Sequence, residues 1–330
     1  MIGNLFGLVI LLALVLLFGW LAKRAWGAKR WFVKFPGVIL AGLLTLVIAA
    51  VFVVAGIGFV KTTIPPGNPA SNIKVQATPE QLARGEKFAL GCSGCHSPNS
   101  QLPLSGGKDN FAEIPNGPTL GSIYPPNLTP AGELKDWSDG EIIRAIREGV
   151  HKSGRPLIIM PTQAFHSMSD NDVQALVAYL RSQPATKNIP QSDTPSNGAN
   201  LLGILFLGGG MFDTSAQPSI TQPISDPPAG VNVQRGQYLA TVMGCADCHG
   251  KTLTGGEPGG FAPVGPNIVA ATANWTEANF LTVFRTGKDP IDGRTLSEEM
   301  PWKDYGKFSD DEFKSVLMYL KTLPKEQPKK

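Results

Sequence analysis

Two short stretches decide how this chain is organised, Cys92-Ser-Gly-Cys95-His96 and Cys245-Ala-Asp-Cys248-His249. Together they hold all four cysteines of the 330 residues and two of the four histidines. The Cys-x-x-Cys-His motif is typical of covalent haem attachment, in which both thiols bond to the haem and the histidine binds its iron. The sequence therefore predicts two covalently bound haem c groups, attached at Cys92, Cys95, Cys245 and Cys248, with His96 and His249 as iron ligands.

Other uses of paired cysteines explain the pattern less well. A thioredoxin-like redox pair needs no histidine after the motif, and a disulfide framework gives no reason for a histidine after both pairs. A four-cysteine zinc site would use the thiols and leave both histidines unexplained.

The sequence around the motifs is an internal repeat, because landmarks recur in one order after each motif or just before it. The matched pairs are Arg84-Gly85 with Arg235-Gly236, Gly117-Pro118 with Gly265-Pro266, Asn127 with Asn267, Trp137 with Trp275, Arg147 with Arg285, Gly154-Arg155 with Gly293-Arg294, Met160-Pro161 with Met300-Pro301, and Tyr179-Leu180 with Tyr319-Leu320. We predict two homologous domains, residues 79–185 and 231–325, joined by a linker over 186–230.

Helix signals recur in both predicted domains. Thr78 followed by Pro79 indicates a capped helix start before the first motif. The capping-box spacing of Ser309 and Glu312 precedes apolar residues at helical spacing. These signals predict an all-α fold for each domain.

The sixth iron ligands are expected to be methionines of the two Met-Pro turns. In the second domain Met300 is favoured, since Met318 lies inside the last predicted helix and Met243 adjoins the proximal motif. In the first domain Met160 shares the context of Met300. His151, His166 and Met168 are nearby alternatives there, with solvated loop positions the simpler interpretation of both histidines.

Three recurring pairs have two interpretations each. Arg147 and Arg285, like Asn127 and Asn267, would contact haem propionates, because a buried carboxylate needs a charged or amide partner. The tryptophan pair would contact the ring edge. Alternatively, the arginines lie on helix surfaces and the tryptophans in the core.

Two apolar runs without a charged side chain, residues 2–22 and 36–60, open the chain. Each is long enough to cross a bilayer as a helix. A cleaved signal peptide would need positive side chains before its apolar stretch, and residues 1–4 have none. We expect a retained transmembrane hairpin over residues 1–60, in contact with membrane lipid.

The charges give the hairpin a direction. The loop 23–34 carries five basic and no acidic residues, and such loops stay in the cytoplasm. The N-terminus and both haem domains are then expected on the periplasmic side of the inner membrane. Residues 61–330 hold 24 basic and 26 acidic residues, so the formal net charge of +3 comes from the loop. This distribution argues against a nucleic-acid partner.

Two segments between these units have less definite roles. Residues 61–78, rich in proline, are expected to form an extended tether from the membrane to the first domain. The apolar stretch 201–212 is too short to span a bilayer. It is expected to lie on the membrane surface, on a partner subunit or between the domains.

Each half resembles a class I cytochrome c domain, with its early Cys-x-x-Cys-His, its Gly-Pro loop, its Met-Pro turn and a last helix ending in Tyr-Leu. The stretch Pro126-Asn127-Leu128-Thr129 before Trp137 is similar to the cytochrome subunits of membrane-bound periplasmic dehydrogenases. Two N-terminal helices with two haems also resemble the dihaem subunit of C-family haem-copper oxidases.

The expected function is electron transfer without chemical catalysis by the chain. Two His/Met haems, with His96, Met160, His249 and Met300 as iron ligands, would relay electrons along the outer face of the membrane. The chain would belong to a respiratory complex, between a quinol-oxidising complex or dehydrogenase and a terminal oxidase or soluble cytochrome. The alternative is a dihaem peroxidase in which one iron is open to hydrogen peroxide.

Overall fold

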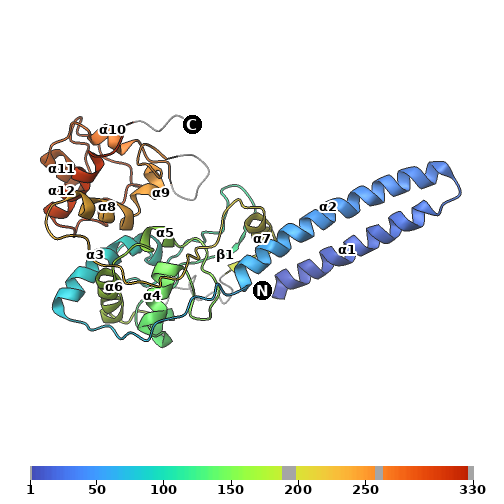
Figure 1. Cartoon of the computed structure of the whole chain (residues 1–330), viewed down its shortest axis with the longest axis horizontal. Helices are drawn as coiled ribbons and strands as arrows, with labels where there is room; N and C mark the ends of the chain where they lie inside the picture. Colours follow the sequence, from blue (N-terminus) through green and yellow to red (C-terminus); the bar gives the residue numbers. More distant parts are fainter. Residues whose placement is uncertain (1, 188–197, 257–262, 326–330) are drawn as a thin grey trace.

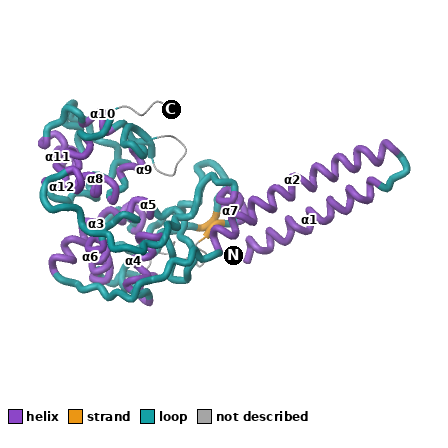
Figure 2. The backbone as a smooth tube through the Cα atoms, viewed as in Figure 1, coloured by secondary structure: helices purple, strands orange, loops and turns teal. Residues whose placement is uncertain are grey.

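The computed structural model describes residues 2–187, 198–256 and 263–325. A long helical hairpin projects from a body that consists of two helical lobes (Figure 1). In the tube view helices form the hairpin and alternate with loops in the lobes, and strand is confined to a small region near the base of the hairpin (Figure 2). The predicted all-α fold with an N-terminal two-helix hairpin is confirmed.

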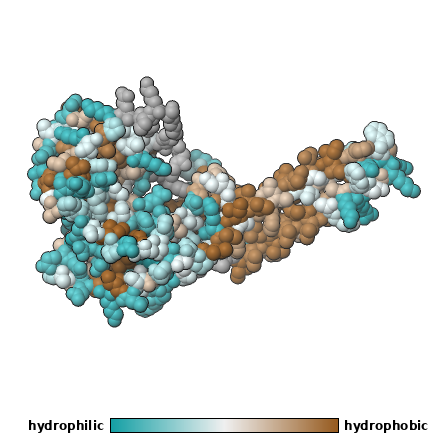
Figure 3. Space-filling model, viewed as in Figure 1, coloured by the Kyte–Doolittle hydropathy of each residue, from teal (hydrophilic) through white to brown (hydrophobic). Residues whose placement is uncertain are grey.

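The hairpin consists of α1 (Ile2–Trp26) and α2 (Trp31–Thr63), which pack along each other. Both helices run beyond the apolar stretches into flanking residues, because a helix satisfies its own backbone hydrogen bonds and long basic side chains reach polar surroundings. Each is long and apolar enough to cross a membrane. Apolar side chains cover the shaft of the hairpin, and polar ones gather at its tip (Figure 3).

A short helix of the stretch between the predicted domains packs on the hairpin. This helix, α7 (Leu201–Gly208), crosses α2 so closely that a Cβ atom on Gly58 would lie 1.7 Å from the carbonyl oxygen of Ile204. A Cβ atom on Gly208 would lie 1.8 Å from the carbonyl oxygen of Val54. The helix therefore does not pack between the two lobes, which was one of the three locations that the sequence suggested, because paired glycines let its backbone touch that of α2. A location on the membrane surface or on a partner subunit stays a prediction.

Polar contacts reinforce this junction at the start of α1 and at the end of α2. Asn4 donates from its Nδ2 to the carbonyl oxygen of Ala199 at 2.9 Å. Lys61 pairs with Asp213, with Nζ and Oδ2 3.2 Å apart. The first lobe is therefore held directly against the base of the hairpin.

The expected tether is extended but packed. Residues 64–78 form no helix or strand and lie along the first lobe. Asn68 is buried and donates to Glu148 at 2.6 Å. A Cβ atom on Gly140 would lie 1.9 Å from the carbonyl oxygen of Ser71, which places the segment directly against that glycine. A free linker would make no such contacts.

The first lobe is built on the crossing of its first and last long helices. A Cβ atom on Gly85 would lie 1.9 Å from the carbonyl oxygen of Ala175, so only glycine allows this crossing. Thr78 and Ser169 cap the two helices. The elements are α3 (Pro79–His96), β1 (Gly121–Ser122), the 3-10 helix η1 (Glu133–Asp136), α4 (Asp139–Glu148), α5 (Thr162–Phe165), α6 (Asp170–Ser182) and β2 (Gly198–Ala199), with β1 and β2 antiparallel.

The second lobe repeats this crossing. A Cβ atom on Gly236 would lie 1.9 Å from the carbonyl oxygen of Ser315. Here the haem-motif helix is broken at Gly244, with φ 69°, whereas α3 runs unbroken through the first motif. The elements are α8 (Val233–Val242), α9 (Cys245–His249), α10 (Ile268–Thr272), α11 (Glu277–Thr286) and α12 (Asp310–Leu320).

The lobes share one apolar core. Buried side chains of both form a single cluster, in which Phe88 of α3 meets the ring of Phe308 edge-on with 5.6 Å between centroids. Burial of such aromatic surface is the main favourable term in their association.

Candidate functional site: two matched haem-attachment sites

The motif histidines are held in the same way in both lobes. Nδ1 of His96 lies 2.9 Å from the carbonyl oxygen of Pro126, and Nδ1 of His249 lies 2.8 Å from that of Pro266. A carbonyl oxygen only accepts, so Nδ1 carries the proton and Nε2 keeps its lone pair for a metal. The repeat alignment is corrected here, since Pro126 and not Pro118 is the structural counterpart of Pro266.

Burial keeps both imidazoles neutral. Desolvation lowers the pKa of His96 and of His249, partly opposed by the hydrogen bonds to the prolines. Burial also raises the pKa of Cys92 and Cys245 to about 12. Protonated thiols do not suit a thiolate redox pair.

Glycine turns close against both motifs. A Cβ atom on Gly107 would lie 2.3 Å from the carbonyl oxygen of Cys95, and one on Gly256 would lie 2.1 Å from that of Cys248. The residue before each glycine donates its N–H to the motif histidine's carbonyl oxygen, at 2.9 Å in the first lobe and 3.0 Å in the second. Each motif is therefore fixed in a backbone cradle.

A large apolar cavity lies beside the first motif. Its volume is about 180 Å³, its walls are mostly apolar, and it is partly open to solvent. Cys92, Cys95, His96 and Met160 all line it. The histidine and the methionine thus face one cavity, although 64 positions separate them in the sequence.

The two predicted sixth ligands, Met160 and Met300, lie in backbone turns of the same kind, one in each lobe. The carbonyl oxygen of Met160 accepts from the N–H of Thr162 at 2.8 Å, and that of Met300 accepts from the N–H of Trp302 at 2.8 Å. Both methionines are half-buried and pack against the shared core. The turn fixes the backbone from which each thioether extends.

The first-lobe alternatives to Met160 are otherwise engaged. Both ring nitrogens of His151 are bonded, Nε2 to Glu133 at 2.7 Å and Nδ1 to Ser153 at 2.8 Å. His166 uses Nδ1 on the carbonyl oxygen of Arg147, and Met168 is fully buried. His166 and Met168 lie outside the cavity lining, whereas His151 belongs to it.

The recurring arginines and asparagines connect elements. Arg147 is buried and pairs with Asp170 at 2.6 Å, while Arg285 pairs with Asp310 at 2.8 Å, so each ties one helix to the start of the last helix in its lobe. Asn127 donates to the carbonyl oxygen of Thr186 and Asn267 to that of Lys325. Arg147 does not line the cavity. Trp137 does, and it meets the ring of His151 edge-on.

One charged residue at the cavity, Arg155, received no role from the sequence analysis. Arg155 lines the cavity and is half-buried. The hydrogen bond from His151 is the main cause that lowers the pKa of Glu133, and the charge of Arg155 adds to this effect. A cationic side chain here suits a haem propionate. The Gly154-Arg155 landmark was the available signal. Its counterpart Arg294 is 69% exposed and pairs with aspartates, so only the structure separates the two.

Comparison with known proteins identifies the family. The cytochrome c family model matches residues 82–184 and 233–324, more than half of the chain. This chain belongs to the cytochrome c family. Domains of this family carry covalently bound haem c, which fits the thiols, the free Nε2 atoms and the apolar cavity described above.

The relatives of this cytochrome are dehydrogenase subunits. It is 32% identical over 255 residues to a nicotinate dehydrogenase subunit of Pseudomonas putida, and the match covers 73% of this chain and 19% of that protein. It is 29% identical over 269 residues to the cytochrome c subunit of a quinone alcohol dehydrogenase of Gluconacetobacter polyoxogenes, covering 72% and 54%. With the gluconate 2-dehydrogenase cytochrome c subunit of Pantoea cypripedii, identity is 30% over 182 residues, covering 53% and 39%.

The chain spans about half, or less, of the length of these relatives. The predicted resemblance to cytochrome subunits of dehydrogenases is confirmed. The relatives also agree with electron relay, while the peroxidase alternative gains no support from them.

Proposed function

We propose that this cytochrome is a membrane-anchored dihaem subunit that relays electrons from a dehydrogenase partner to an acceptor in or beside the membrane. The observation that supports it best is the matched pair of motif histidines, each with Nδ1 on a proline carbonyl oxygen and Nε2 left for iron. Bound haem c would supply one-electron chemistry at each site.

The residues of the chain have separate roles in this proposal. Cys92, Cys95, Cys245 and Cys248 attach the haems, and His96 and His249 bind iron on one side. Met160 and Met300 would supply the second protein ligand of each iron, which would close the iron to small substrates and raise its reduction potential. These assignments leave no iron position for peroxide, as an electron-transfer subunit requires.

The partner class follows from the relatives. Their names are those of nicotinate, alcohol, gluconate and fructose dehydrogenases, so the donor is proposed to be the catalytic subunit of such an enzyme. The loop rich in Lys and Arg supports a location of the haem lobes on the periplasmic side of the inner membrane. The two-helix anchor, in contact with membrane lipid, suits a permanent place in a complex.

The experiment that tests the proposal uses the full chain, purified in detergent from membranes of a host that attaches haem c. Intact mass and haem absorbance count the haems per chain, and tagged chain pulled from native membranes is tested for a dehydrogenase subunit. We expect two haems and a bound dehydrogenase whose substrate reduces both. A single haem, or haems that the dehydrogenase substrate leaves oxidised, would contradict the proposal.

A further inference from the structure

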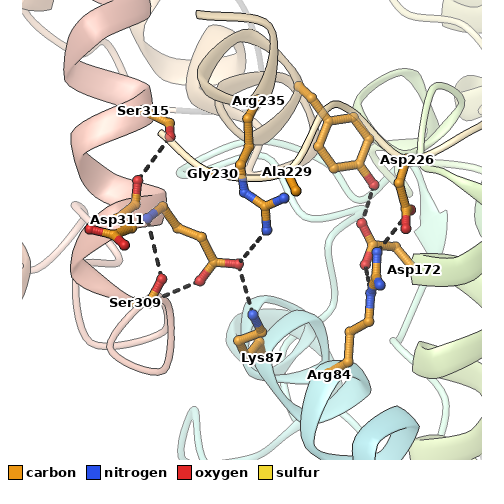
Figure 4. A network of polar contacts seen from close by, with 12 residues as sticks. Arg84, Lys87, Asp172, Asp226, Ala229, Gly230, Arg235, Ser309, Asp311 and Ser315 are labelled. Carbon is orange, nitrogen blue, oxygen red and sulfur yellow. Dashed lines mark hydrogen bonds and ion pairs between the residues drawn. The ribbon is translucent and has the colours of Figure 1, made fainter. Parts of the chain in front are cut away.

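The surface between the two lobes is built from matched residues. Within the first lobe Arg84 pairs with Asp172, and within the second Arg235 pairs with Glu312 at 3.4 Å (Figure 4). Both arginines belong to the repeat landmark before the haem motif, and both acids lie in the first turn of the last helix. Each lobe thus presents one buried acid beside its own arginine.

A second donor for each acid comes from the other lobe. Lys87 of α3 donates to Glu312 at 2.8 Å, and the hydroxyl of Tyr238 of α8 donates to Asp172. Lys87 and Tyr238 occupy the same position, three residues after the arginines Arg84 and Arg235. The exchange is reciprocal, as in an interface with two-fold symmetry.

Both acids are desolvated by this exchange. The side chains of Asp172 and Glu312 are only 5% and 7% exposed. Beside Lys87, the ring of Phe308 is buried, with Nζ 5.4 Å from its centroid. A buried charge that loses its partner is strongly unfavourable, so the pairs favour one docked arrangement.

The same symmetry extends to the haem-attachment segments. A Cβ atom on Gly94, within the first motif, would lie 4.0 Å from Oδ2 of Asp304, and one on Gly244, before the second motif, would lie 4.0 Å from Cβ of Ala164. Asp304 and Ala164 are matched positions, each four residues after the predicted methionine ligand. Each methionine loop therefore packs on the opposite lobe's haem motif.

One dipeptide lies beside both motifs. Asp304 is close enough to Cys92 and Cys95 for its charge to help raise the pKa of both thiols, after the larger effect of burial. The adjacent Tyr305 donates to the carbonyl oxygen of Met243 at 2.5 Å, and burial, followed by the charge of Cys245, raises its pKa. The dipeptide Asp304-Tyr305 thus lies next to residues of both attachment segments.

We propose that this pseudo-twofold face is an internal electron-transfer interface, which keeps both haem-attachment segments against each other so that the lobes exchange electrons without undocking. The inference rests on the proposed function. In the step itself one ferrous iron loses an electron and the ferric iron of the other lobe gains it, with no bond made or broken. The chain contributes the fixed distance between the lobes.

The test uses the full chain in detergent, compared with a Lys87→Glu/Tyr238→Phe double variant and one control variant. Lys87→Glu places a carboxylate against buried Glu312, and Tyr238→Phe removes the reciprocal hydroxyl. Lys314→Glu is the matched control, because Lys314 also pairs with acids, but only within the second lobe. Pulsed electron paramagnetic resonance of the fully oxidised protein measures the coupling between the two ferric spins. Rapid freezing after sub-stoichiometric reduction follows electron redistribution at several protein concentrations.

We expect strong spin coupling and concentration-independent redistribution in the wild type and in Lys314→Glu. In the Lys87→Glu/Tyr238→Phe double variant, redistribution should slow by about tenfold or more, since like charges across an interface oppose docking. Concentration-dependent redistribution in the wild type, or no change in the double variant, would overturn the inference. Because low-spin spectra and haem count are recorded on each sample, loss of a haem or of its ligand is recognised separately as failure of the proposed function.

Discussion

The histidine nitrogens show how single residues determine this site. Sequence spacing predicted His96 and His249, but the proton position comes from the carbonyl oxygens of Pro126 and Pro266. The sequence repeat paired Pro266 with Pro118, because each follows a glycine, whereas the structure places Pro126 in the matching position. The acceptor is a backbone carbonyl oxygen, so its position depends on the path of the chain. A matching dipeptide does not reveal that path.

The methionine ligands give the first prediction at this scale. Met160→Ala and Met300→Ala should each leave one iron with an open sixth position, so that half of the haem binds carbon monoxide. Met318→Ala, at a 40% exposed position on α12, is the control and should bind none. Optical titration with carbon monoxide measures the fraction. Carbon monoxide binding that is unchanged in either variant would show that another residue is the ligand.

Asp304 gives a prediction on pH. Burial raises the pKa of its carboxyl from 3.8 to about 6, with Lys303 opposing the shift. The folded state therefore favours the protonated acid, and the stability it contributes is present below about pH 4 and lost as the pH rises through about 6. The unfolding free energy, measured with denaturant across this pH range, should therefore fall as the pH rises in the wild type. In Asp304→Asn this dependence on pH should disappear. The control is Asp292→Asn, whose side chain is 58% exposed, and it should keep the wild-type dependence of unfolding free energy on pH. An equal pH dependence in both variants would show that Asp304 is not its source.

At the scale of elements, the sequence carries a signal for the two helix crossings but none for the position of α7. The crossings depend on glycines before each motif, which the repeat marks in the sequence. The contact of α7 with α2 joins residues about 150 positions apart and needs the glycines Gly58 and Gly208 for its close approach. No periodicity or composition signal connects two such glycines.

This contact gives a prediction about the junction with the hairpin. Gly58→Ala puts a Cβ atom into the carbonyl group of Ile204, and overpacking of this kind costs about 1–3 kcal/mol. Gly56→Ala on the same helix meets nothing within 4 Å and should be neutral. Thermal unfolding in detergent and protease cutting near residue 210 measure the effect. Equal melting of both variants would contradict a tight α2–α7 contact.

At the scale of the whole molecule, the chain combines an apolar hairpin, a lobe held against it and a second lobe docked on the first (Figure 1). The sequence predicted the units but not their docking, because the crossing donors Lys87 and Tyr238 differ in type and carry no repeat signal. The symmetry becomes visible only in the structure, where Lys87 donates to Glu312 and Tyr238 donates to Asp172.

The docking gives a stability prediction. Tyr238→Phe removes a hydrogen bond to buried Asp172, and bonds to charged groups contribute about 1.5–3 kcal/mol. The unfolding free energy should fall by about that amount. Tyr319→Phe, whose hydroxyl has no partner among the described residues, should change it little. A loss of equal size in both variants would mean that the interface bond adds nothing.

We propose that one histidine and one methionine bind each iron in an electron-relay subunit. The optical spectrum of the full chain in detergent, poised oxidised and reduced, with carbon monoxide added to the reduced form, tests this ligation directly. We expect two low-spin haems, a methionine-to-iron charge-transfer band that scales with both, and no carbon monoxide binding. A high-spin fraction or carbon monoxide binding at either haem in the unmodified chain would contradict it.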